Sequence, residues 1–330
     1  MSTRFVDVGY MQGCESNAGS MFQAASNFNG IEAIGEYSKP DGETFITDYI
    51  DDGTQGPAAS VSAGPGAISR VLLPFFDPEK PAEEWRQTRA NQMEMLGDLN
   101  EYFTVKNGYI VQTGAEEKVD EDPASESNKA IVEKVKVCVH ADEEVVFSYH
   151  EDYPDCLYKC IDKYPQSENA DINGENAHIS DENVVSEKKN KLPNHKICQV
   201  YCAAMNLDQG RSGETNARLE SNGVKAKLLL EAAYMGTYLA AIRHGCKKVF
   251  LTLIGGGVFG NSTATILDVI EKVHLEIACK EKNDVIEEVH VVLFNPVPTL
   301  QKFLSSLRGK GVEVEIHGFK RGQGTIYTNF

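Results

Sequence analysis

The fold is decided by one stretch of the chain, residues 247–261, with the sequence KKVFLTLIGGGVFGN. Its first half is rich in β-branched and aromatic residues, a composition typical of a strand buried on both faces. The strand ends at three consecutive glycines, and a fourth glycine follows two residues later. A new apolar-periodic segment begins at Thr263, where Asn261 or Ser262 is placed to cap a helix. The stretch therefore predicts a strand, a glycine loop and a helix in succession.

A strand, glycine loop and helix in this order have the geometry of a phosphate site. Glycines allow backbone N–H groups to approach an anion closely, and the helix N-terminus adds partial positive charge. The alternative is a tight turn without a ligand, although one glycine is sufficient for such a turn. We therefore expect the chain to bind a phosphorylated small molecule.

Two common glycine-rich phosphate-binding motifs, the dinucleotide-binding motif and the P-loop, do not fit the sequence around this loop. Gly255, Gly257 and Gly260 satisfy the pattern G-x-G-x-x-G of dinucleotide-binding enzymes. That motif also requires an acidic residue at the end of the next strand, to bind the ribose hydroxyls of NAD. The next predicted strand, 289–294, is followed by Asn295 instead, which disfavours a Rossmann NAD-dependent oxidoreductase. A P-loop is excluded because no Gly-Lys-Ser/Thr follows the glycines.

The region from Val224 to Pro296 resembles the second half of macrodomains, the ADP-ribose-binding modules. In these modules a helix like the one predicted for 224–243 leads into a buried strand and a loop ending Gly-Val/Ile-Phe-Gly, which wraps the pyrophosphate. The resemblance implies that Phe259 packs under a ribose and that Asn295 or Phe294 borders the adenine. The ligand-binding residues that it implies in the loop are Gly255, Gly256, Gly257, Val258, Phe259, Gly260 and Asn261.

The resemblance also implies a second ligand loop, after an early strand in the N-terminal half. The matching stretch is residues 23–32, with the sequence QAASNFNGIE. Asn27 or Asn29 would face the distal ribose, and Gly30 stands where macrodomains carry several glycines. The alternative is that both asparagines only stabilise a turn.

An acidic segment follows this second loop. Its carboxylates are Glu32, Glu36, Asp41, Glu43, Asp48, Asp51 and Asp52. A charge run is usually a solvated surface, and Asp52 is also suited to cap a helix. The sequences DGTQGPA at residues 52–58 and FNxxE at residues 28–32 resemble the corresponding sequences of a divergent macrodomain branch. That branch includes arginine-directed ADP-ribosylhydrolases of bacterial effector type.

This finer resemblance implies a hydrolase that removes ADP-ribose from arginine on a modified protein. Cleavage at ribose C1 passes through an oxocarbenium-like state; one carboxylate activates water or fixes the ribose hydroxyls, and another holds the leaving guanidinium. Neighbouring carboxylates also raise one another's pKa, which suits an acid or base near neutrality. The candidate catalytic residues, in order of preference, are Asp52, Asp41, Glu32 and Asp51. The alternative is a non-catalytic reader that binds ADP-ribose; neither function needs a cofactor.

Composition restricts the partners. The formal net charge is −17, which argues against nucleic acid and does not exclude a small dianion. The partner that the resemblance implies is ADP-ribose or an ADP-ribosylated protein. No run of 18 apolar residues occurs and no apolar signal region follows Met1, so we expect a cytoplasmic protein without a membrane partner. Cys156/Cys160 and Cys198/Cys202 are spaced C-x3-C, but the second pair lies in a strand-like segment. Residues four apart on a strand are about 13 Å apart, so we expect no metal site.

The order of elements predicts the architecture. Strands that alternate with helices predict a mixed, mostly parallel sheet with helices on both faces. Together with the resemblance, this implies a single domain over residues 1–330 with a three-layer α/β/α macrodomain-like fold. Loop inserts are expected near 40–55, 114–128 and 165–193, and a tail at about 318–330. Further strands are expected at 5–10, 21–26, 109–112, 135–140, 145–148, 197–203 and 312–316, and helices at 58–75, within 83–103 and at 298–307.

Overall fold

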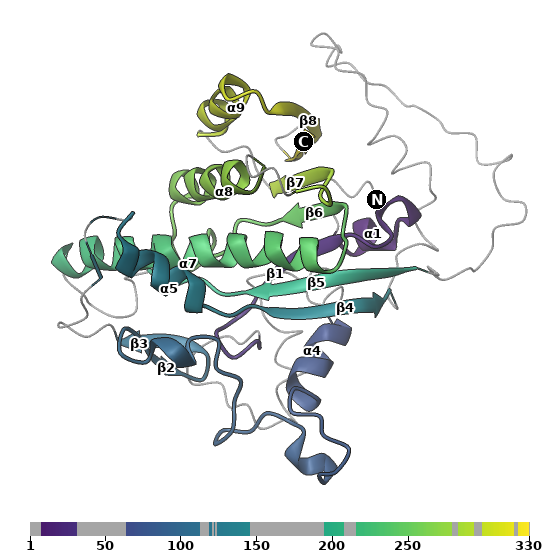
Figure 1. The fold of residues 1–330 in the computed structure, drawn as a ribbon, viewed down its shortest axis with the longest axis vertical. Helices are drawn as coiled ribbons and strands as arrows, with labels where there is room; N and C mark the ends of the chain where they lie inside the picture. The colour runs from purple at the N-terminus through teal and green to yellow at the C-terminus, as the bar shows by residue number, and fades with distance from the viewer. Residues whose placement is uncertain are drawn as a thin grey trace, which may run out of the picture.

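A seven-stranded sheet forms the centre of the molecule (Figure 1). The computed structural model describes residues 8–31, 64–112, 119–120, 122, 124–145, 195–207, 216–278, 283–293, 299–319 and 323–329. The strand order is β4-β5-β1-β6-β7-β9-β8. The strands are β1 (Met21–Ala25), β4 (Cys138–Glu144), β5 (Lys196–Cys202), β6 (Lys248–Leu251), β7 (Glu288–Leu293), β8 (Glu313–Phe319) and β9 (Gln323–Asn329).

Four neighbouring strands of this sheet are parallel. Met21 at the start of β1 pairs with Cys198 of β5 on one side and with Val249 of β6 on the other, and β6 pairs in parallel with β7. The outer strands β4, β9 and β8 are antiparallel to their neighbours. The expected mixed α/β class with a parallel run of strands is therefore confirmed. Because β1 lies between β5 and β6, the loops that follow these three strands leave the same edge of the sheet next to one another.

Long helices cover one face of the parallel strands. The helices α7 (Asn216–Arg243), α8 (Thr263–Ala278) and α9 (Leu300–Gly309) follow one another in a row in Figure 1, and residues of all three join the largest apolar cluster. That cluster includes side chains from alternate positions of β5, such as Val200 and Cys202, as expected for a pleated strand. On the opposite face, Phe22 stacks on Phe250 with ring centroids 4.3 Å apart, and Met11 packs beside them.

Shorter elements lie around the β4 edge and the ends of the strands. They are α1 (Val8–Gly13), α4 (Gly64–Leu72), α5 (Glu126–Lys134) and the separate hairpin of β2 (Thr104–Lys106) and β3 (Tyr109–Gln112). Helix α4 contacts β4, and α5 packs against α7. No helix of the described residues is both long enough and apolar enough to cross a membrane.

Several sequence-based expectations are wrong, each for a physical reason. Val8–Gly13 is helical, whereas a strand was expected at 5–10; Val8 and Met11, three residues apart, both pack on the cluster around Phe22. Residues 318–319 and 323–329 belong to β8 and β9, because β9 pairs along the whole of β7. The first residues of α5, 126–128, fall inside the loop expected at 114–128, because Ser125 caps the helix by accepting from the Asn128 backbone N–H.

The expected amphipathic helix within 83–103 is also absent. In its place the described segment has two short 3₁₀ turns, Ala82–Glu84 and Gly97–Leu99, joined by irregular chain. The apolar residues of this segment also predict core contacts at Trp85, Met93, Met95, Leu96 and Leu99. Of these, Met95, Leu96 and Leu99 are buried, whereas Trp85 and Met93 are partly buried. The apolar pattern thus predicted three of the five core contacts but not the backbone conformation.

Candidate functional site

The glycine loop begins on a rigid base. Directly after β6, the Thr252 carbonyl accepts a hydrogen bond of 2.7 Å from the buried hydroxyl of Tyr234 on α7. The same hydroxyl accepts from the Ile254 backbone N–H at 3.2 Å, and Gln23 of β1 accepts from the Thr252 N–H at 3.2 Å. These side chains hold the strand end in place from two neighbouring elements, so the loop starts from a fixed position.

The first glycine and the last residue of the loop are structural. Gly255 has φ +71°, and a Cβ atom there would lie 2.6 Å from the Ala204 Cβ, so only glycine fits. The buried amide of Asn261 donates to the carbonyls of Met205 at 2.9 Å and Gly255 at 3.1 Å. Asn261 therefore closes the loop from within, while Ser262 caps α8 by accepting from the Thr265 N–H at 3.1 Å.

The middle of the loop presents an exposed surface. Gly256, Gly257 and Val258 are exposed, and a Cβ atom on Gly257 would meet no heavy atom within 4 Å. Within the described part of the chain, the backbone N–H groups of Gly257, Val258 and Phe259 donate no hydrogen bond. These donors precede the N-terminus of α8, which adds partial positive charge. The surface is suited to an anion.

The predicted asparagine loop lies after β1, and its two asparagines have different environments. Asn29 is engaged in the turn, since its Oδ1 accepts from the Ile31 N–H at 3.1 Å and its Nδ2 donates to Gln92 at 3.0 Å. Asn27 is only 3% exposed, and its Nδ2 has no hydrogen-bond partner among the described residues. Asn27 therefore carries the unpaired donor, whereas Asn29 stabilises the backbone.

Two buried side chains support the asparagine loop from behind. Arg70 of α4 donates through Nε to the Gly30 carbonyl. Gln87 is fully buried and donates through Nε2 to the Asn29 carbonyl at 2.8 Å and to the Arg70 carbonyl at 2.9 Å. Gly30 faces these supports: a Cβ atom on it would lie 2.8 Å from the Cys138 Sγ. It lies at the back of the loop, not on the side of Asn27.

The structure brings the two predicted loops together through a third element. The turn of the β2–β3 hairpin contacts the asparagine loop through Gly108 and the glycine loop through Tyr109. In Figure 1 the hairpin lies on the side to which the β5 and β6 arrowheads point. Sequence reasoning assigned a strand at 109–112 but gave its first residue no function. The Asn107-Gly108 dipeptide was the available signal, because Asn-Gly favours a two-residue hairpin turn.

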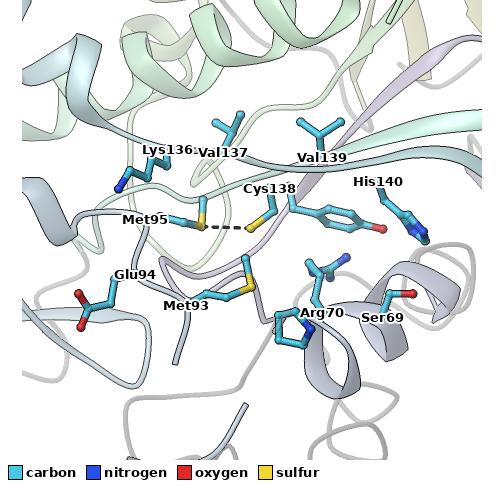
Figure 2. Close-up of a pocket in the computed structure, with 12 residues that line it drawn as sticks. Ser69, Arg70, Met93, Glu94, Met95, Lys136, Val137, Cys138, Val139 and His140 are labelled. Carbon is cyan, nitrogen blue, oxygen red and sulfur yellow. Dashed lines mark hydrogen bonds between the residues drawn. The ribbon is translucent and has the colours of Figure 1, made fainter. Parts of the chain in front are cut away.

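A cavity of about 420 Å³ lies behind the asparagine loop, between α4, residues 93–95 and β4 (Figure 2). Figure 2 shows the sulfur atoms of Met95 and Cys138 next to one another in its lining, where the Cys138 thiol donates to the Met95 sulfur at 3.7 Å. The Arg70 guanidinium lies 3.2 Å from the centroid of the Tyr201 ring, a cation–π contact. Burial raises the pKa of the Cys138 thiol to about 11 and also raises the pKa of Tyr201.

Three of the charged or titratable side chains around this cavity contact a partner. Lys136 forms an ion pair with Asp98 at 3.0 Å, and His140 lies 3.2 Å from the carboxylate of Glu143. Arg70 is held by the Gly30 carbonyl and the Tyr201 ring. The cavity wall thus supports the rear of the asparagine loop, and we assign no ligand to it.

The remaining predicted site residues lie outside the described residues. These are the carboxylates Glu32, Asp41, Asp51 and Asp52, together with Phe294 and Asn295. Among the described residues no group of three or more His, Cys, Asp or Glu side chains is arranged to hold a metal ion. No protein-family model, curated protein or solved structure matches the chain. Its function must therefore be argued from its own residues.

Proposed function

We propose that the chain binds ADP-ribose between the glycine loop and the asparagine loop, in a macrodomain-like three-layer fold. The observation that carries the proposal is the row of backbone N–H groups at Gly257, Val258 and Phe259, which donate no hydrogen bond within the described residues and precede the N-terminus of α8. Backbone N–H groups bind phosphate without lysine or arginine, which is consistent with a net charge of −17.

The environment of Asn27 favours a ligand that extends beyond the phosphates. A buried donor without a partner costs about 1–3 kcal/mol, and a ribose hydroxyl accepting from its Nδ2 would remove that cost. Because this atom is out of contact with solvent, a ligand reaches it only when a neighbouring group moves aside. Asn27 faces the distal ribose in this arrangement, and the pyrophosphate lies over Gly257.

The reaction that we propose is hydrolysis of the bond between ADP-ribose and an arginine side chain. The carboxylates Asp41 and Asp52 would activate water and hold the departing guanidinium, whose positive charge an acidic segment favours. The rival function is a reader that binds ADP-ribose without cleaving it, and the glycine loop serves both functions equally.

Calorimetric titration with ADP-ribose, AMP and NAD tests the binding function. We expect saturable binding of ADP-ribose; no binding at millimolar concentration would reject the proposal. Release of ADP-ribose from arginine-modified protein then tests catalysis, with Asp41→Asn and Asp52→Asn as variants. A hydrolase loses turnover in these variants and keeps its affinity for ADP-ribose. A reader shows no turnover in the wild-type protein.

A further inference from the structure

The β2–β3 hairpin stands apart from the central sheet. Its two strands pair only with each other among the described strands. They are joined by Asn107 and Gly108, with φ of +49° and +81°. Both residues thus have positive φ, as a two-residue type I′ turn requires. Since no other described strand pairs with this hairpin, its position depends on the contacts of its turn and on Ile110, which packs against the apolar cluster around Leu96 and Leu99.

One side of the turn fixes the asparagine loop. The Gly108 carbonyl accepts a hydrogen bond of 2.9 Å from the Phe28 N–H. A Cβ atom on Gly108 would lie 2.5 Å from the Asn29 Oδ1 and 2.8 Å from the Asn27 Cβ, so the turn lies directly against both asparagines. Gln92 adds a bridge, because its amide bonds to Asn107 and to Asn29, each at 3.0 Å.

The other side of the turn contacts the glycine loop. The Tyr109 ring packs against the Phe259 ring, with centroids 5.9 Å apart and planes at 59°. Phe259 is itself tied to the loop after β5, since its carbonyl accepts from the Leu207 N–H at 2.7 Å. Two consecutive residues, Gly108 and Tyr109, therefore contact the two loops that bind ADP-ribose in the proposed function.

We propose that this hairpin sets the spacing between the two ligand loops, with Tyr109 as the positioning residue, and thereby selects ligands that reach both loops. The inference rests on the proposed function. ADP-ribose carries a pyrophosphate for the glycine loop and a distal ribose for Asn27, whereas ADP lacks the distal ribose. Loss of the spacing therefore weakens ADP-ribose binding more than ADP binding.

Calorimetric titration of full-length variants with ADP-ribose and ADP tests this inference. An aromatic pair contributes about 0.5–1.5 kcal/mol, so Tyr109→Ala should weaken ADP-ribose binding roughly two- to twelvefold and ADP binding less than twofold. Tyr109→Phe keeps the ring and should restore the wild-type ratio of affinities. Val111→Ala, at an exposed position of the same strand, is the matched control and should change neither affinity.

The ratio of the two affinities is the informative quantity, because general destabilisation lowers both affinities together. Tyr109→Ala with wild-type binding, or with equal losses for both ligands, would overturn the inference. Should Tyr109→Ala not fold, Gln92→Ala removes the half-buried bridge between the hairpin and Asn29 and must lower the same ratio. A wild-type protein that binds neither nucleotide refutes the proposed function itself, before any variant is compared.

Discussion

Substitution of Gly257 by valine should impair ligand binding at the proposed surface without destabilising the fold. A Cβ atom at Gly257 meets no heavy atom within 4 Å, and the residue is exposed. We therefore expect Gly257→Val to change the free energy of unfolding by no more than about 0.5 kcal/mol, as is usual for surface substitutions. The two added methyl groups would nevertheless occupy the space in which a bound pyrophosphate lies against the loop.

The expected loss of affinity follows from the hydrogen bonds that the phosphate can no longer make. A hydrogen bond to a charged group contributes about 1.5–3 kcal/mol. Loss of one bond from the row Gly257–Phe259 therefore weakens ADP-ribose binding roughly 10- to 150-fold, and loss of two weakens it further. Calorimetry measures the affinity, and urea denaturation of the same samples measures the stability.

Gly255→Ala is the matched control in the same loop. It adds a single carbon, but at φ +71° and 2.6 Å from the Ala204 Cβ. The left-handed backbone and the close contact should together reduce stability by about 1–3 kcal/mol. Substitution of Gly257 should thus affect mainly the affinity for ADP-ribose, and substitution of Gly255 mainly the stability of the fold. A stable Gly257→Val protein that binds ADP-ribose as tightly as the wild type would refute a phosphate site on the exposed side of the loop.

Three further substitutions test the supports of the site and the core. Burial lowers the pKa of His274 to about 4 from an ordinary value near 6.5, so the neutral ring stabilises the fold fully above pH 6.5. That stability, up to about 3 kcal/mol, is lost as pH falls from 6.5 to 4. His274→Leu should therefore reduce the pH dependence of the free energy of unfolding, measured by urea denaturation at several pH values. Tyr234→Phe removes the hydroxyl that bonds to the Thr252 carbonyl and the Ile254 N–H, which then keep only their 3.0 Å bond to each other, and should cost about 0.5–1.5 kcal/mol by urea denaturation; an unchanged midpoint contradicts the rigid base of the loop. Lys136→Met, at an exposed ion pair, should shift the melting temperature by no more than about 2 °C.

The parallel part of the fold could be predicted because local pattern and tertiary environment agree there. Residues 249–251 form a continuous apolar run and are the buried part of strand β6, and Thr263 begins α8 as the cap signal indicates. The segment at 5–10 has no comparable signal: it is short, and an apolar segment of this length fits a strand or a helix equally well. Pairing of β9 with β7 is a long-range contact that the sequence of the tail does not reveal.

The sequence predicts that a glycine loop is present but not which role each of its residues has. Sequence reasoning treats Gly255, Gly256 and Gly257 alike. The structure distinguishes them by their neighbours: a Cβ atom would lie 2.6 Å from Ala204 at Gly255, 3.1 Å from Ile266 at Gly256, and in open space at Gly257. Such distances depend on chain segments far apart in sequence, so no local pattern encodes them.

The misassigned segment within 83–103 has a physical explanation that also concerns the site. Gln87 accepts from the Met93 N–H at 2.9 Å while its amide donates to the carbonyls of Asn29 and Arg70. A helix would satisfy the Met93 N–H internally but leave those two carbonyls unpaired in the interior, at about 1–3 kcal/mol each. Helix propensity differs by less than about 0.7 kcal/mol among ordinary residues, so the tertiary hydrogen bonds decide the conformation. The side chain that prevents the helix is therefore the one that holds the asparagine loop, and local propensity fails where the proposed site is supported.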